Sequence, residues 1–272
     1  MMTDTTGVTA LSIPPLARAL SGVRALAAHE ALHDAAQAGD VVALRQAIAE
    51  GADVNARRTE NNVNSLTPLL NVVDGSSLAP AFYGPGPRAL VIKERTACVR
   101  VLLEAGASAS ACAIHAFDSD SDGDSDDGEV HQHRGHVEHK WTALQEAAIY
   151  GLKEIMKLLL DAGADVEARE GNCGMTPFQQ VLRSACIHSQ RNRQELVTLL
   201  LSRGAVDGEA TLYRVDTSIS SYLQKIRAAG GYAKYEKQHR AKLLATFAPK
   251  FDVLPPEVVS VVITYWGHVG SY

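Results

Sequence analysis

The sequence contains no run of 18 apolar residues, and only four of its 272 residues are cysteines. Without a long apolar run, no transmembrane helix is expected. Phosphate-binding loops, nucleophile elbows and dinucleotide-binding motifs are also missing, so the enzyme classes that depend on them have no support. The cysteines do not occur at paired spacings, which argues against a disulfide framework and favours a reduced, intracellular protein. They are Cys98, Cys112, Cys173 and Cys186.

Charge is unevenly distributed along the chain, whose formal net charge is −5. Residues 118–129 (DSDSDGDSDDGE) hold seven acidic residues and no base, whereas residues 212–250 hold eight bases and two acids. This separation predicts a flexible acidic insertion and a basic C-terminal tail. Hydrophobic residues make up 46% of the chain and strand-like segments are scarce, so we predict a folded, all-α protein.

One sequence pattern occurs four times. Its first copy, from Glu30 to Arg57, predicts two helices joined by a turn and followed by a hairpin-like finger. From the opening residue to the glycine that closes the second helix, the copies span 21, 39, 21 and 28 residues, so the second and fourth carry insertions between their helices. The later copies open at Thr67, Thr142 and Thr176, and the closing glycines are Gly51, Gly106, Gly163 and Gly204.

The repeated residue types have physical reasons. A threonine before the first helix accepts a hydrogen bond from a free backbone N–H, and a proline at the first helical position presets φ. The closing glycines stand where a helix ends in a left-handed turn. Apolar residues at a spacing of three to four on each second helix form a stripe that only a neighbouring unit can bury.

The pattern resembles the ankyrin repeat, a unit of about 33 residues. Leu32, His33, Ala35 and Ala36 match the T-P-L-H-x-A-A motif of that family's first helix, and the segment from Gly51 to Asn55 matches the end of its second helix. Later copies have Leu70, Gln145 and Gln179 in place of the histidine. The resemblance implies a solenoid of about four helix pairs with a helical C-terminal cap, which binds another protein and is not an enzyme.

In the ankyrin family, finger tips and first helices line a concave groove. The resemblance therefore implies that matching positions here contact a protein partner whose identity the sequence leaves open. We expect a cytoplasmic monomer that binds neither membrane nor nucleic acid and needs no cofactor. The candidate partner-binding residues are Arg57, Arg58 and Glu60 near the first finger and Arg169, Glu170 and Asn172 near the third.

Three regions are expected: an N-terminal extension (1–28), the repeats (29–206) and a helical tail (207–272). Long loops are predicted at 75–92 and 110–139, the second of them in a finger. The segment from Pro15 to Ala28 predicts a helix that covers the exposed side of the first unit. No basic segment followed by an apolar block begins the chain, so no secretory signal is expected, but its scarcity of acids leaves an organellar transit peptide open.

Two adjoining segments could bind metal. The acidic run matches the calcium-loop pattern through Asp118, Asp120, Asp122, Gly123 and Glu129. Ser125, however, stands where a calcium loop has an apolar residue, and the flanking segments are not amphipathic helices. The histidines after it suit a transition metal but lie in a predicted loop without fixed partners. We therefore predict no dedicated metal site. These histidines are His131, His133, His136 and His139.

The segment from His29 to His33 (HEALH) matches the H-E-x-x-H motif of zinc proteases. That chemistry requires both histidines on one helical face, with the glutamate as general base. The repeat pattern instead predicts His29 in the turn before the helix and His33 at the family's own histidine position. A structural role is therefore expected.

The last predicted helix, in LPPEVVSVVITYWG (254–267), has almost no polar face and is expected to be buried. It is similar to the L-P-x-E opening of F-box segments, which dock a ubiquitin-ligase subunit. Two interpretations stay open: residues 254–266 cap the repeats, or they make the protein a substrate adaptor of a ubiquitin ligase. A metal-dependent activity is a third and weaker alternative. Capping is preferred because an exposed Val/Ile/Trp helix favours aggregation.

Overall fold

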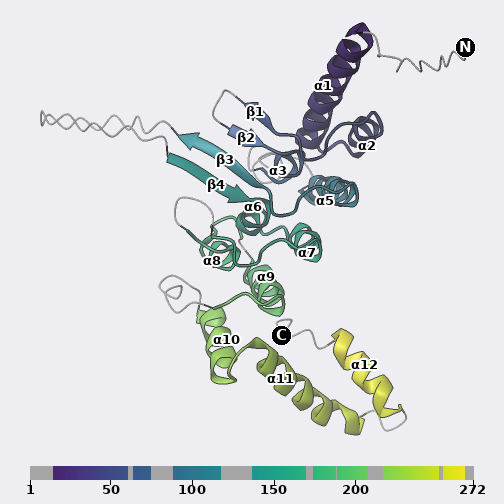
Figure 1. Ribbon diagram of the computed structural model, residues 1–272. Helices are drawn as coiled ribbons and strands as arrows, with labels where there is room; N and C mark the ends of the chain where they lie inside the picture. The colour runs from purple at the N-terminus through teal and green to yellow at the C-terminus, as the bar shows by residue number, and fades with distance from the viewer. Residues whose placement is uncertain are drawn as a thin grey trace, which may run out of the picture.

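The computed structural model describes residues 15–60, 64–74, 88–117, 137–169, 174–187, 189–207, 217–250 and 254–266. Most of the described chain is helical, as predicted. Its first eight helices form two layers of paired helices (Figure 1). Helices α1, α3, α6 and α8 contact one another in that order, and α2, α5, α7 and α9 follow the same order. The pairs are α1 (Pro15–Ala38) with α2 (Val41–Ala49), α3 (Pro68–Val73) with α5 (Arg88–Glu104), α6 (Ala143–Tyr150) with α7 (Lys153–Asp161), and α8 (Pro177–Arg183) with α9 (Gln190–Ser202).

Side-chain caps begin these helices where the residue types predicted them. Thr67 accepts a hydrogen bond from the backbone N–H of Leu70 at the start of α3. Thr142 and Thr176 form capping boxes with the glutamines three residues later. The four closing glycines have φ between 85° and 92°, which confirms the left-handed turns.

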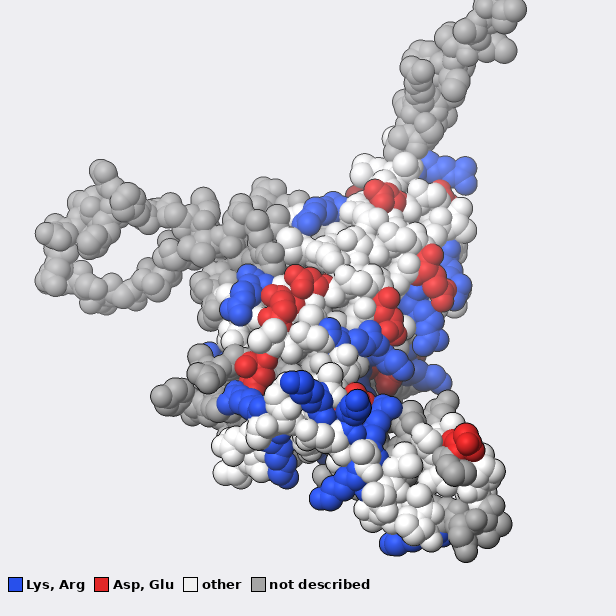
Figure 2. Space-filling view, turned by 60° about the horizontal axis from the view of Figure 1, so that its bottom comes forward, with Lys and Arg blue, Asp and Glu red and all other residues white. Residues whose placement is uncertain are grey.

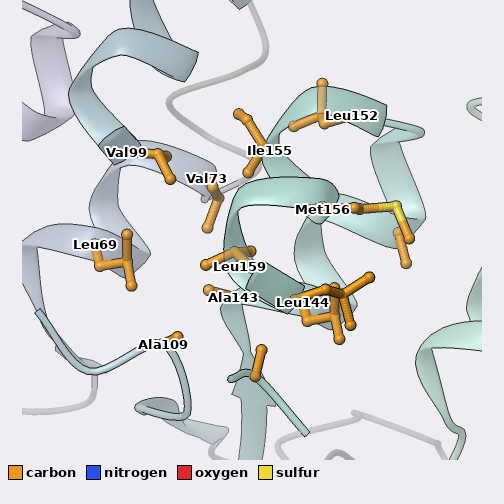
Figure 3. Packing of buried hydrophobic residues seen from close by; sticks show 14 of the residues in the cluster. Leu69, Val73, Val99, Ala109, Ala143, Leu144, Leu152, Ile155, Met156 and Leu159 are labelled. Atoms are coloured by element: carbon orange, nitrogen blue, oxygen red, sulfur yellow. The ribbon is translucent and has the colours of Figure 1, made fainter. Parts of the chain in front are cut away.

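The core lies between the two helical layers. In Figure 3, Val73 of α3 and Val99 of α5 lie beside Ile155 and Leu159 of α7, so neighbouring pairs interlock through apolar side chains. All four of these residues are fully buried. Cys98 is also buried, and burial raises the pKa of its thiol to about 11. A thiol with that pKa stays neutral and packs as a small apolar group.

Four short strands form one antiparallel sheet beside the first helices (Figure 1). Its order is β1-β2-β3-β4, and the Ser65↔Ile114 pairing joins the first finger to the second. The prediction of a loop over the whole of 110–139 is therefore wrong at both ends, because residues 112–117 pair with residues 137–142 as antiparallel strands. The pairing of β2 with β3 joins segments that lie far apart in the sequence, so local patterning did not predict these strands. The strands are β1 (Arg58–Glu60), β2 (Asn64–Leu66), β3 (Cys112–Phe117) and β4 (Val137–Thr142).

An arginine closes the first helix in each of the two pairs that carry an insertion; Arg95 is buried and Arg193 is half-buried. Arg95 of α5 donates to the carbonyl oxygens of Ala36, Gln37 and Val72 at the ends of α1 and α3. Arg193 of α9 donates to the carbonyl of Leu182 in the last turn of α8 and to those of Ser184 and Ile187 after it. Each arginine stands 11 residues before its closing glycine, at 106 and 204. The insertions thus add helix to the second element: α5 begins at Arg88, inside the loop predicted for 75–92.

The C-terminal region adds helices α10 (Thr217–Ala228), α11 (Tyr232–Phe247) and α12 (Pro256–Trp266), with a 3₁₀ turn at Ala248–Lys250. The apolar stripe of α10 joins the core after α9 and covers the end of the helix pairs. Helix α11 adds only Tyr232 and Tyr235 against this core, and none of its residues is buried. Leu243, Leu244 and Phe247 of α11 are half-buried and do not belong to this core. The stripe of α10 consists of Ile219, Tyr222, Leu223 and Ile226.

Helix α12 packs on α11. Val259 is buried, but Val258 is 43% exposed, Val261 55% and Val262 38%. The prediction of a fully buried helix is thus wrong for these three valines, because α12 packs mainly on α11 and contributes no residue to the main core. The side chains of 263–266, Trp266 included, lie outside the described residues.

Helix α1 runs without a break from Pro15 to Ala38, so the expected boundary at 28/29 falls inside a helix. Ala28 is buried, whereas Val23 is 67% exposed and Leu26 61%, so these two do not cover the first unit as expected. No helix in the described part of the chain is both long and apolar enough to cross a membrane.

Candidate interaction surface

A buried histidine ties the first finger to its helix. His33 places Nε2 3.1 Å from the carbonyl oxygen of Ala56 and Nδ1 3.0 Å from Nδ2 of Asn71. A carbonyl only accepts, so Nε2 of the ring donates to Ala56, and Asn71 holds the opposite ring nitrogen. The sequence analysis did not single out Asn71, although a polar residue inside the apolar run PLLNVV signalled a buried partner.

Gln145 ties the third finger to its helix in the same way. Its Nε2 donates to the carbonyl of Ala168 at 3.3 Å and to that of Met175 at 2.8 Å, while its Oε1 accepts from the backbone N–H of Thr142 at 2.9 Å. The residue is fully buried. His33 and Gln145 each bond to the carbonyl 23 residues further along, so the same contact occurs in both units.

The candidate residues of the first finger differ in availability. Arg57 is exposed and donates to the carbonyl of Ser65 at 3.2 Å. Arg58 forms an ion pair with Asp34 of α1, and its side chain is only 24% exposed. It therefore helps to fix the finger against α1. The side chain of Glu60 lies outside the described residues.

In the third unit, Arg169 is exposed, and Glu170 and Asn172 lie outside the described residues. Arg57 and Arg169 stand at the same place in their units, each six residues after a closing glycine. A basic side chain thus occurs at the same position in the first and third fingers. A small cavity of about 200 Å³ lies beside the third finger, and its lining includes Ser110, Asp165 and Ala168.

The metal-binding hypotheses receive no geometric support from the described chain. Among its residues, no group of three or more His, Cys, Asp and Glu side chains is close enough to hold a metal ion. His139 lies in β4, but its side chain is outside the described residues. The other weak candidates also lie outside them: Asp118, Asp120, Asp122, Glu129, His131, His133 and His136.

The zinc-protease match fails on the chemistry of His33. His29 does lie within helix α1, so its predicted place in a turn is wrong, and the two histidines are one helical turn apart. Both ring nitrogens of His33 are engaged by Ala56 and Asn71, however, so neither is available to coordinate zinc.

Comparison with family models agrees with this geometry over part of the chain. A comparison with curated proteins finds no match. Residues 139–170, which include the end of β4, helices α6 and α7 and the Gln145–Ala168 contact, match the model of the ankyrin repeat. Ankyrin repeats are typically interaction modules without enzymatic activity. This match supports an ankyrin-repeat protein.

Proposed function

We propose that this protein recognises another protein through the face on which its fingers meet the first helices. Under this proposal, residues 29–206 form four ankyrin units in a solenoid, one for each helix pair. The unit from Glu30 to Arg57 carries the same contact as the segment that matches the family model, a buried polar side chain bonded to the carbonyl 23 residues later. That shared contact is the observation that carries the proposal.

The contact matters for binding because it fixes the fingers before a partner arrives. A finger held by buried hydrogen bonds loses little conformational entropy on association. The first finger is held by His33 and by the ion pair between Arg58 and Asp34, and the third finger is held by Gln145. The surface is therefore pre-organised at both positions.

Arg57 and Arg169 are the side chains that we propose to contact the partner first. Both are exposed, and an arginine fork binds carboxylates in pairs of hydrogen bonds. We expect the partner to present acidic side chains to them. Arg58, Glu60, Glu170 and Asn172 would border the same contact.

The test compares charge reversals on two faces. In affinity purification from native cells, Arg57→Glu with Arg169→Glu should lose the partner that wild type captures. Arg45→Glu with Lys157→Glu is the matched control, since these exposed bases lie on the second helices α2 and α7 of the same units. Equal loss in both double variants, or retention in the first, would contradict the proposal.

The exposed valines of α12 favour a second candidate function. Val258, Val261 and Val262 follow helical spacing and form an apolar stripe that is open to a partner. This stripe lies in the segment that is similar to an F-box opening, so the alternative is a ubiquitin-ligase adaptor that docks through residues 254–266. Val261→Asp should then remove a ligase subunit from the captured proteins without lowering the melting temperature. Capture of no ligase subunit by wild type would end this alternative.

A further inference from the structure

A cavity of about 290 Å³ opens between α9, α10 and α11, away from the fingers. Three polar side chains on α10 line it, and α9 and α11 close it from either side. Among the described residues, none of those that line it is a carboxylate. The polar lining residues are Gln194, Ser218, Ser221, Lys225 and His239, and the rings of Tyr222 and Tyr235 form the remaining wall.

Two observations give the cavity a preference for anions. Lys225 brings a positive charge to its rim. Nε2 of His239 is buried and has no hydrogen-bond partner among the described residues. A buried polar atom without a partner is costly unless a ligand supplies one. The cavity also runs along the first turns of α10, where the helix dipole favours negative charge.

The aromatic wall is rigid and uncharged. The hydroxyl group of Tyr222 is held 3.0 Å from Oγ1 of Thr198, and its ring meets that of Tyr235 edge to face at 5.8 Å. Tyr235 in turn stacks on His239 at 6.0 Å. Burial raises the pKa of Tyr222 to about 12 and raises that of Tyr235, so both phenols stay neutral and add no repulsion toward an anion.

The surroundings are basic as well. Residues 217–250 carry seven lysines and arginines against one acid, Glu236. That acid is neutralised by Arg240, 2.6 Å away. Figure 2 shows lysine and arginine gathering toward the end of the molecule that these helices form. An approaching anion is therefore attracted before it reaches the cavity.

We propose that this cavity binds a phosphate monoester, presented as a phosphorylated side chain of a protein partner. A phosphate has three acceptor oxygens, which suits the amide, hydroxyl, ammonium and imidazole groups gathered here better than a single carboxylate would. The concave shape and aromatic wall suit an inserted side chain rather than a flat membrane surface. The cavity is separate from the finger surface, and this proposal does not depend on the function proposed for the finger surface.

The test follows the His239 side-chain resonances of the full-length protein by NMR at constant ionic strength. Phosphotyrosine, phosphoserine and inorganic phosphate are the probes, and tyrosine is the unphosphorylated control. We expect saturable shifts with the phosphorylated probes and none with tyrosine. Lys225→Gln should weaken binding about tenfold, because a charge-assisted contact is lost. Lys237→Gln, which removes an exposed lysine of α11 outside the cavity lining, should change it less than twofold.

Three results would overturn the proposal. The first is the absence of saturable shifts with every phosphorylated probe. The second is equal weakening in the Lys225→Gln and Lys237→Gln variants, which would show a diffuse charge effect. The third is a response to vesicles containing phosphatidylserine without any response to the phosphorylated amino acids, which would assign the basic helices to a membrane surface.

Discussion

Replacing Arg95 with alanine should destabilise the protein more than any exposed substitution on the same helix. Arg95 is 5% exposed, and its guanidinium donates to three backbone carbonyls, at 3.0 Å to Ala36, at 3.3 Å to Val72, and to Gln37. Burial lowers the pKa of this group, which donates to carbonyls in the last turns of α1 and α3, where a helix leaves its carbonyls without partners of its own. Its removal takes this donor from both helix ends, although Ala36 still accepts from the backbone N–H of Gly39.

The expected loss follows from that contact set. A hydrogen bond from a charged donor contributes about 1.5–3 kcal/mol, and the carbonyls left behind regain some solvation, so we expect Arg95→Ala to lower the free energy of unfolding by about 3–5 kcal/mol. Arg95→Lys keeps the charge but loses the planar fork, so its loss should be intermediate. Chemical denaturation followed by circular dichroism measures both.

The matched control is Arg100→Ala, an exposed arginine five residues later in α5. Its change should stay within about 0.5 kcal/mol. If Arg95→Ala and Arg100→Ala destabilised the protein equally, the role of the buried arginine in closing the inserted units would be refuted.

Three further predictions concern local features. Gly151→Ala should cost more than Gly163→Ala: both glycines have positive φ, but an added Cβ at 151 would lie 2.9 Å from Cγ1 of Ile187, whereas at 163 it would meet nothing within 4 Å. Denaturation should give about 1–2 kcal/mol for Gly163→Ala and at least 1 kcal/mol more for Gly151→Ala; equal costs would contradict the packing at α6. Gln145→Ala should cost about 2–4 kcal/mol and speed amide exchange in residues 166–169, and unchanged exchange there would argue against its hold on the finger. Burial and Asp74 raise the pKa of Glu146 to about 7, so the folded state binds a proton that the unfolded state has already released. Stability should therefore fall as pH rises from about 4.5 through 7, and Glu146→Gln should lack this fall in melts across that range; identical pH profiles would refute it.

Local features of the fold could be predicted from residue types because they depend on a few neighbouring residues. A threonine cap needs only the next turn of helix, and a closing glycine needs only its own φ. Thr142, Thr176 and the glycines from Gly51 to Gly204 therefore take the conformations that the sequence predicted. The equivalence of Arg57 and Arg169 could also be read from their spacing.

Features that depend on distant partners could not be predicted in this way. The sheet joins residues about 50 positions apart, such as Ser65 and Ile114, and no local pattern encodes that pairing. Arg95 reaches carbonyls 23 to 59 residues away, so its burial could not be inferred from its own helix. The exposure of Val261 has the same cause, because it depends on how many helices surround α12.

The most direct test of the proposed binding face is a hydrogen-exchange footprint of the protein with and without the partner recovered by affinity purification. Binding through the fingers and first helices predicts slower exchange in residues 56–66 and 140–150 and around Arg169, with α12 unchanged. Protection confined to residues 254–266, with the fingers exchanging as in the free protein, would contradict the proposal and assign recognition to the C-terminal helix.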